Sequence, residues 1–99
     1  MNREDIRKLL VKTITDIQVS SGRSVPQLLD DTRIIGDLED FGSLNSIEVT
    51  CIVSAHLGFE VDAKLFIPKV FGQPVTLGAA IDRLCEQYEA HQRGGRKHG

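Results

Sequence analysis

The 99-residue chain contains no tryptophan, one tyrosine, four phenylalanines and two cysteines. With so few aromatic residues, we expect the core to be built mainly from aliphatic side chains. The two cysteines, Cys51 and Cys85, are too few for a zinc site of the usual spacing. They lie within apolar helical patterns, which favours small core residues over a disulfide bridge. The sequence has no long apolar run, so we expect neither a membrane-spanning segment nor a signal peptide. We therefore predict a cytoplasmic protein without a membrane partner.

Charge is unevenly distributed along the chain. Lys and Arg number 12 against 14 Asp and Glu, but three of the basic residues lie in the acid-free segment 93–99. The remainder has nine basic and 14 acidic residues, a net charge of −5. An acidic body argues against binding to the phosphate backbone of nucleic acids and suits partners that present Lys and Arg.

Three segments have the periodicity of amphipathic helices. They run from about residue 2 to 19, from 43 to 57, and from a cap at Thr76 to about 91. Asp62 is expected to cap a short helical turn through Phe66, and no stretch shows the alternation typical of strands. We therefore predict an all-α fold, a four-helix bundle with three main helices, one short third helix and a long first loop. Residues 1–91 form one domain, and the basic tail, 92–99, is predicted to be disordered.

The first loop, residues 23–42, is long enough to be functional or to contain a helical turn. Its apolar residues, which we expect to anchor it to the core, are Leu28, Leu29, Ile34, Ile35 and Leu38. The helix that follows is apolar on more than one face, so we expect it to be central and to touch several neighbours or line a cavity. Its main stripe is formed by Leu44, Ile47, Cys51 and Ala55. We expect the core to include Leu44, Ile47, Val61 and Ile81.

The most informative segment is 41–49, where Ser43 follows Gly42 at the junction between an acidic loop and an apolar helix. The first turn of a helix has unpaired N–H groups and the positive end of the helix dipole. A phosphate on an exposed serine is therefore favourable there. A simpler role is also open, because a serine at such a junction commonly acts as an N-cap.

The region around this serine resembles the acyl carrier proteins, small four-helix bundles with a modified serine at the start of the second helix. Ser43-Leu44, followed by apolar and acidic residues at 47–49, has the family's spacing. Three further segments, 37–38, 57–61 and 76–81, are similar to the family's in the same order. The resemblance extends over about residues 3–90.

The resemblance implies that a phosphopantetheinyl transferase attaches 4′-phosphopantetheine from coenzyme A to Ser43. The arm would carry an acyl or aminoacyl group as a thioester in fatty-acid, polyketide or related biosynthesis. It implies a monomeric, non-catalytic carrier whose partners are the transferase and acyl-loading and acyl-processing enzymes. No catalytic or metal-binding cluster is recognisable in the sequence. The residues expected to dock on partners are Asp37, Glu39, Asp40, Leu44 and Glu48.

Two departures from the family pattern keep alternatives open. The family's Asp before the serine is Gly42 here, which is consistent with a carrier-fold interaction module that is never modified. Ser46 is a rival attachment site, because Asn45-Ser46-Ile47 imitates the motif. The distance in sequence from each serine to segment 57–61 favours Ser43. The second helix has a single acid, which favours a specialised carrier over the housekeeping fatty-acid carrier.

Overall fold

The computed structural model describes the backbone of residues 1–98 and the side chains of residues 1–94. Its elements, in chain order, are α1 (Arg3–Ser20), α2 (Ile34–Asp37), α3 (Ser43–Leu57), the 3₁₀ helix η1 (Ala63–Phe66) and α4 (Leu77–His98). Within residues 1–98 there are two isolated β-bridges but no strand. The predicted all-α bundle is confirmed, with α1, α3 and α4 as its main helices and η1 as its short third helix.

The start of α1 is fixed by a reciprocal pair of hydrogen bonds. The N-cap Asn2 accepts the backbone N–H of Asp5 on its Oδ1 at 2.9 Å, and Asp5 Oδ2 accepts the N–H of Asn2 at 3.2 Å. Each bond satisfies an N–H group that the first turn would otherwise leave unpaired. The buried face repeats every three to four residues, as predicted, and consists of Ile6, Leu10, Thr13, Ile14, Ile17 and Gln18.

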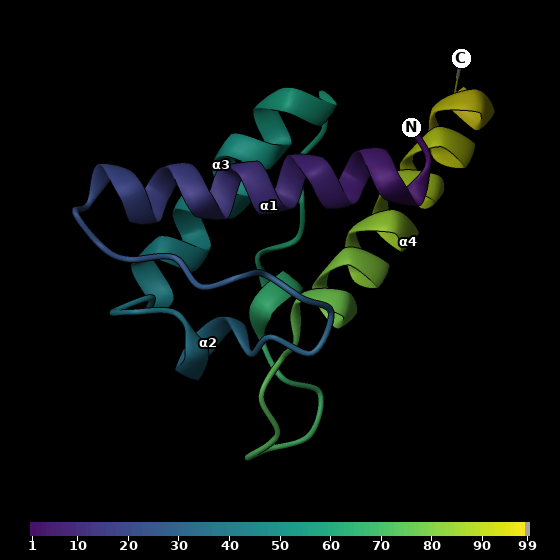
Figure 1. The fold of residues 1–99 in the computed structure, drawn as a ribbon. Coiled ribbons are helices and arrows are strands. Elements are labelled where there is room, and N and C mark those ends of the chain that lie inside the picture. The colour runs from purple at the N-terminus through teal and green to yellow at the C-terminus, as the bar shows by residue number, and fades with distance from the viewer. Residues whose placement is uncertain (99) are drawn as a thin grey trace.

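α1 lies across the front of the molecule in Figure 1 and packs against both α3 and α4. The short helix η1 packs against the same two helices, so a single core lies among the four elements. Phe41 and Phe66 form an edge-to-face pair in this core, with ring centroids 6.2 Å apart. The remainder is aliphatic, as the composition predicts, and its fully buried members include Ile6, Leu10, Ile14, Ile34, Leu65, Leu77, Ile81 and Leu84.

The long first loop contains the helical turn α2 and is held against Val75, just before α4, and against the first two residues of α4. The Ile34 N–H donates to the carbonyl of Val75 at 3.0 Å, and the Leu77 N–H donates to that of Thr32 at 2.8 Å. The Gly78 N–H donates to the carbonyl of Asp30, which lies earlier in the same loop, at 2.9 Å. The loop is therefore attached to the bundle by backbone bonds as well as by apolar contacts.

Two of the five residues predicted to anchor this loop do not reach the core. Ile34 and Leu38 are buried and Leu28 is partly buried, as expected. Leu29 and Ile35, in contrast, are about half exposed, at 49% and 50%. A single turn such as α2 has one buried side, so the residue next to Ile34 faces outward.

The boundaries of the later helices agree with the sequence except at the C-terminus. Asp62 caps η1 by accepting the Lys64 N–H on Oδ1 at 2.8 Å. α4 was predicted to end at about His91, yet it continues through Gly94 and its glycine neighbour to His98. Each helical glycine costs about 1 kcal/mol relative to alanine, which weakens a helix without ending it. The disorder predicted for the tail, 92–99, stays a prediction, and Gly99 lies outside the described residues.

None of the helices in residues 1–98 combines the length and apolar character needed to cross a membrane. The two cysteines are free thiols in different surroundings. Cys85 is partly buried against the core, as predicted, and burial raises the pKa of its thiol. Cys51 is exposed on α3, so the prediction that it is a core residue is wrong.

Candidate functional site at the start of α3

Ser43 is the first residue of α3, at the end of that helix nearer to α2 in Figure 1. Its side chain is exposed, and its hydroxyl forms no hydrogen bond with other described residues. The N-cap is Gly42, with φ −128° and ψ −165°. The interpretation of Ser43 as an N-cap is therefore wrong, and its hydroxyl oxygen is accessible for reaction.

The backbone around Ser43 is suited to a negatively charged substituent. The first intrahelical bond of α3 runs from the Ser46 N–H to the Gly42 carbonyl at 3.0 Å. The three N–H groups that precede it have no partner within the helix, and the helix dipole adds partial positive charge there. A Cβ built on Gly42 would have no heavy atom within 4 Å. A phosphodiester on the exposed Ser43 side chain is therefore favourable electrostatically.

The rival serine, Ser46, has a different environment. It is partly buried, and its Oγ donates to the carbonyl of Gly42 at 3.2 Å. Modification of this hydroxyl would break a bond within the first turn of the helix. The geometry therefore favours Ser43 over Ser46 as the site of modification, as the sequence spacing also does.

A polar network that was not predicted from the sequence fixes the backbone at this junction. Gln18, fully buried near the end of α1, donates from Nε2 to the Glu39 carbonyl at 2.8 Å, and its Oε1 accepts from Arg23 Nη1 at 3.1 Å. The same Arg23 nitrogen donates to Asn45 Oδ1 at 3.2 Å. That oxygen also accepts the Gly42 N–H at 3.1 Å. The network thus joins α1, the first loop and the first turn of α3.

Two of the loop acids predicted to dock on partners already have partners within the molecule. Asp37 Oδ1 accepts from Arg33 Nη2 at 2.8 Å, and Oδ2 accepts the Arg33 N–H at 2.8 Å. These bonds hold the pKa of the Asp37 carboxyl below its ordinary value. Glu39 Oε2 accepts the N–H and the hydroxyl of Ser24 at 2.9 and 2.8 Å, which lowers the pKa of Glu39. Asp40 is exposed, with a positive φ of 51°.

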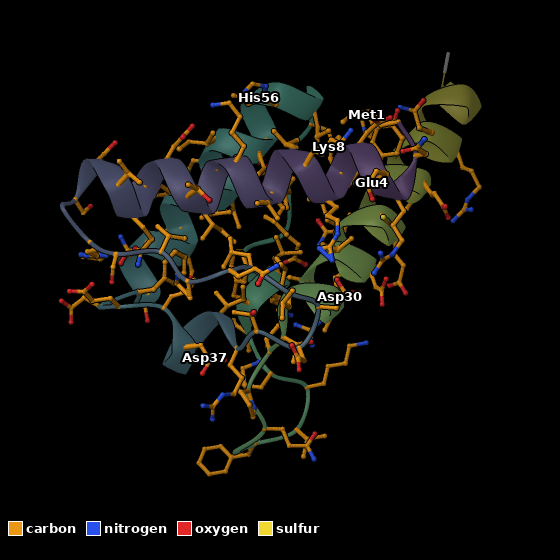
Figure 2. All side chains as sticks on the ribbon, in the orientation of Figure 1. Met1, Glu4, Lys8, Asp30, Asp37 and His56 are labelled. Atoms are coloured by element: carbon orange, nitrogen blue, oxygen red, sulfur yellow. The ribbon has the colours of Figure 1, made fainter. Side chains whose placement is uncertain are left out.

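The predicted docking residues lie on three different elements. Asp37 belongs to α2, and Figure 2 shows it at the opposite end of the molecule from His56, which lies near the end of α3. Glu48, one turn along α3 from Ser43, accepts from Asn45 Nδ2 at 3.1 Å. Leu44 is next to Ser43 and is 77% exposed. The structure therefore brings Leu44 and Glu48 close to the serine along α3, while Asp37 is held on the neighbouring turn.

The buried face of α3 differs from the predicted one. Leu44 and Ile47 were predicted to be core residues, but both are more than half exposed. Because α3 is apolar on nearly all sides, its periodicity does not distinguish the inner from the outer face. Thr50 is able to face inward because its Oγ donates to the Ile47 carbonyl at 2.8 Å. The residues that face the core are Val49, Thr50 and Val53.

The exposed stripe of α3 forms one wall of a groove of about 1170 Å³. Residues from the middle of α4 and from the segment after α3 also line this groove. The ring of Phe59 in that segment stacks on His91 of α4, with centroids 4.4 Å apart. Ile47, one turn from Ser43, is the lining residue of α3 nearest to it in sequence. The residues of α3 and α4 that line the groove are Ile47, Thr50, Cys51, Ser54, Ala55, Gln87, Ala90 and His91.

Among the residues that the structure describes, no group of three or more His, Cys, Asp or Glu side chains is placed to hold a metal ion. The chain matches no protein-family model, no curated protein and no solved structure. The functional argument therefore rests on the chemistry of the Ser43 junction and on the sequence resemblance described above.

Proposed function

We propose that the protein is a non-catalytic carrier that holds acyl or aminoacyl groups as thioesters on a 4′-phosphopantetheine arm attached to Ser43. The observation that carries this proposal is the exposed, unbonded hydroxyl of Ser43 on the first residue of α3. The resemblance of the surrounding sequence to acyl carrier proteins supplies the identity of the arm.

In the attachment step, Ser43 Oγ attacks the coenzyme A phosphorus that bears the pantetheine. The new Oγ–P bond replaces the P–O bond to the second phosphate, adenosine 3′,5′-bisphosphate leaves, and the transferase accepts the hydroxyl proton. The free N–H groups of the first turn stabilise the resulting phosphodiester. When bound, the cofactor supplies the thiol that carries the cargo, while the protein supplies position and recognition.

The contacts described above support an exposed arm on a fixed base. The network through Gln18, Arg23 and Asn45 holds the backbone of the junction while it leaves the serine side chain free. A carrier needs this combination, because its arm must reach partner active sites from a defined position. Ile47 lines the groove between α3 and α4, and the apolar part of this groove suits the acyl portion of a cargo.

We further propose that partner enzymes contact the start of α3 mainly through apolar side chains. Leu44 and Ile47 are exposed there, whereas Asp37 and Glu39 are engaged within the molecule. Asp40 and Glu48 are exposed acids close to this apolar area in sequence, and Glu48 also accepts from Asn45 Nδ2. Apolar anchors with a charged rim are typical of protein docking sites.

The test is incubation of the full chain with coenzyme A and a broad-specificity phosphopantetheinyl transferase, followed by intact-mass measurement. We expect a gain of one phosphopantetheinyl group. Ser43→Ala should abolish the gain, whereas the matched variant Ser46→Ala should retain it. A gain that persists in Ser43→Ala would refute the assignment of the serine.

The second candidate is an interaction module with the same fold that is never modified, and Gly42 in place of the family's Asp favours it. The discriminating measurement is the intact mass of the protein isolated from its native host. A pantetheinylated fraction supports the carrier. A homogeneous unmodified chain that also resists several transferases in vitro would support the interaction module.

A further inference from the structure

The loop between η1 and α4, residues 67–74, extends below the rest of the molecule in Figure 1. Its apolar residues are unusually exposed for a small domain. Phe71 reaches 103% of its reference exposed area, and Ile67 and Val70 are each more than half exposed. The two residues that flank the loop, Phe66 and Val75, are buried. The loop therefore has buried ends and an apolar tip.

The tip is held in this arrangement by local structure. The Gln73 N–H donates to the Val70 carbonyl at 3.1 Å, and Gly72 between them has φ +85°. A positive φ at the third residue is what a type II turn requires, and it places Phe71 at the second position. At the base of the loop, Arg83 Nη1 on α4 donates to the carbonyl of Ile67 at 2.7 Å. The exposure of the phenylalanine thus follows from a defined turn on an anchored base.

The charge around the loop is opposite in sign to that of the body. Residues 63–81 contain no Asp or Glu, in a protein whose residues outside segment 93–99 have a net charge of −5. Lys64 and Lys69 are exposed and form no ion pair with described residues. Together with Ile67 they line one hollow, whose other charged members are Arg83 and Glu86. Cationic side chains therefore outnumber acids behind the apolar tip.

We propose that the 67–74 loop contacts anionic membrane surfaces. Phe71, Val70 and Ile67 enter the interface between headgroups and acyl chains, and Lys64 and Lys69 meet lipid phosphates. A protruding apolar tip with cations beside it suits a bilayer, which accepts a convex shape without a matching pocket. The contact lies on the membrane surface and needs no spanning segment. It goes beyond the carrier function and does not depend on it.

The chain has no tryptophan, so Phe71→Trp introduces a single fluorescent reporter at the tip. With vesicles of phosphatidylcholine and phosphatidylglycerol, we expect its emission to shift to the blue, and the shift should weaken as salt is added. The matched control is Val19→Trp, at an exposed position on the last turn of α1. Its emission should not change.

Binding itself is measured by flotation of the wild-type chain with the same vesicles. Phe71→Ser should weaken vesicle affinity about tenfold or more, because the ring no longer leaves water. Lys64→Gln with Lys69→Gln should reduce binding to the anionic vesicles to the level seen with phosphatidylcholine alone. Circular dichroism checks that these surface variants remain folded.

Three results would overturn the proposal. One is an unchanged emission of Phe71→Trp both with the anionic vesicles and with vesicles of phosphatidylcholine alone. Another is equal binding to neutral and anionic vesicles, which would remove the role of the lysines. The third is a blue shift that grows with protein concentration in the absence of vesicles, which would assign the tip to a second copy of the chain.

Discussion

The start of α3 and the tip of the 67–74 loop are both exposed on fixed bases, but their bases and exposed groups differ. The backbone next to Ser43 is held by a network of the Gln18, Arg23 and Asn45 side chains, and the group left free is a small hydroxyl. Phe71 is held by a backbone turn and by one arginine, and the group left free is a large apolar ring. The first arrangement suits covalent attachment, and the second suits a non-covalent contact that removes apolar area from water.

The largest effect is expected from breaking the base of the first region. Gln18→Ala leaves the Glu39 carbonyl without its donor, removes one of the two acceptors of Arg23 Nη1 and opens a cavity beside α1. We expect a loss of about 2–3 kcal/mol in the free energy of unfolding, measured with urea. The matched variant at an exposed glutamine, Gln27→Ala, should change it by less than about 0.5 kcal/mol. Equal effects of the two variants would contradict a structural role for the network.

The base of the second region is tested by Arg83→Met. The variant removes the bonds from Nη1 to the carbonyls of Lys64, Leu65 and Ile67 but retains most of the side-chain stem. We expect a loss of about 1–2 kcal/mol, less than for Gln18→Ala, because the arginine is only partly buried. Lys8→Met, at the exposed position on α1 labelled in Figure 2, is the control and should be nearly neutral. A stability equal to that of the wild type would show that the turn alone fixes the loop.

A smaller effect is expected from substitutions of Gly42, which separate helix capping from a need of the transferase for a carboxylate at this position. Gly42→Asp fits without strain, because φ is −128° and a Cβ meets no atom within 4 Å. Asp and Asn are both better N-caps than Gly, so each should stabilise the fold by a few tenths of a kcal/mol. If the transferase needs the family's carboxylate, Gly42→Asp should raise the modification rate and Gly42→Asn should not. Identical rates for the two variants would exclude that need.

The smallest effect concerns pH and the acidic loop before α3. Hydrogen bonds from Ser24 lower the pKa of Glu39 in the folded state. The stability that these bonds provide is therefore present above the ordinary glutamate pKa and is lost as pH falls through the lowered folded value. The difference in unfolding free energy between the wild type and Glu39→Gln should shrink as the pH drops below about 4. A difference that stays constant with pH would rule out this contribution.

Much of the fold could be predicted because local signals agree with one another. The bounds of α3 follow from Gly42 before it and from Gly58 after it, which has φ +80°. The cap at Asp62 and the buried stripe of α1 could likewise be predicted from the sequence. The end of α4 was not, because a Gly-Gly pair is unfavourable in a helix but does not forbid one.

The site was only partly predictable, for reasons that lie in tertiary structure. An apolar pattern on every side of α3 gave no way to tell that Leu44 faces solvent. The signal for the polar network was present but weak, since Gln18 occupies a position on the core stripe of α1 next to Ile17. Its partner Arg23 comes from another segment, and sequence periodicity does not report such pairings. The exposure of Phe71 depends on a turn and on an arginine of α4, which is a long-range contact.

The exposure of Cys51 provides a built-in reporter position. This thiol lines the groove two turns along α3 from Ser43, whereas burial raises the pKa of the second thiol, on Cys85, and lowers its reactivity. An environment-sensitive dye will therefore label Cys51 first without any engineered cysteine. Its fluorescence would test in real time whether the proposed cargo enters and leaves the groove, on a chain with no substitution.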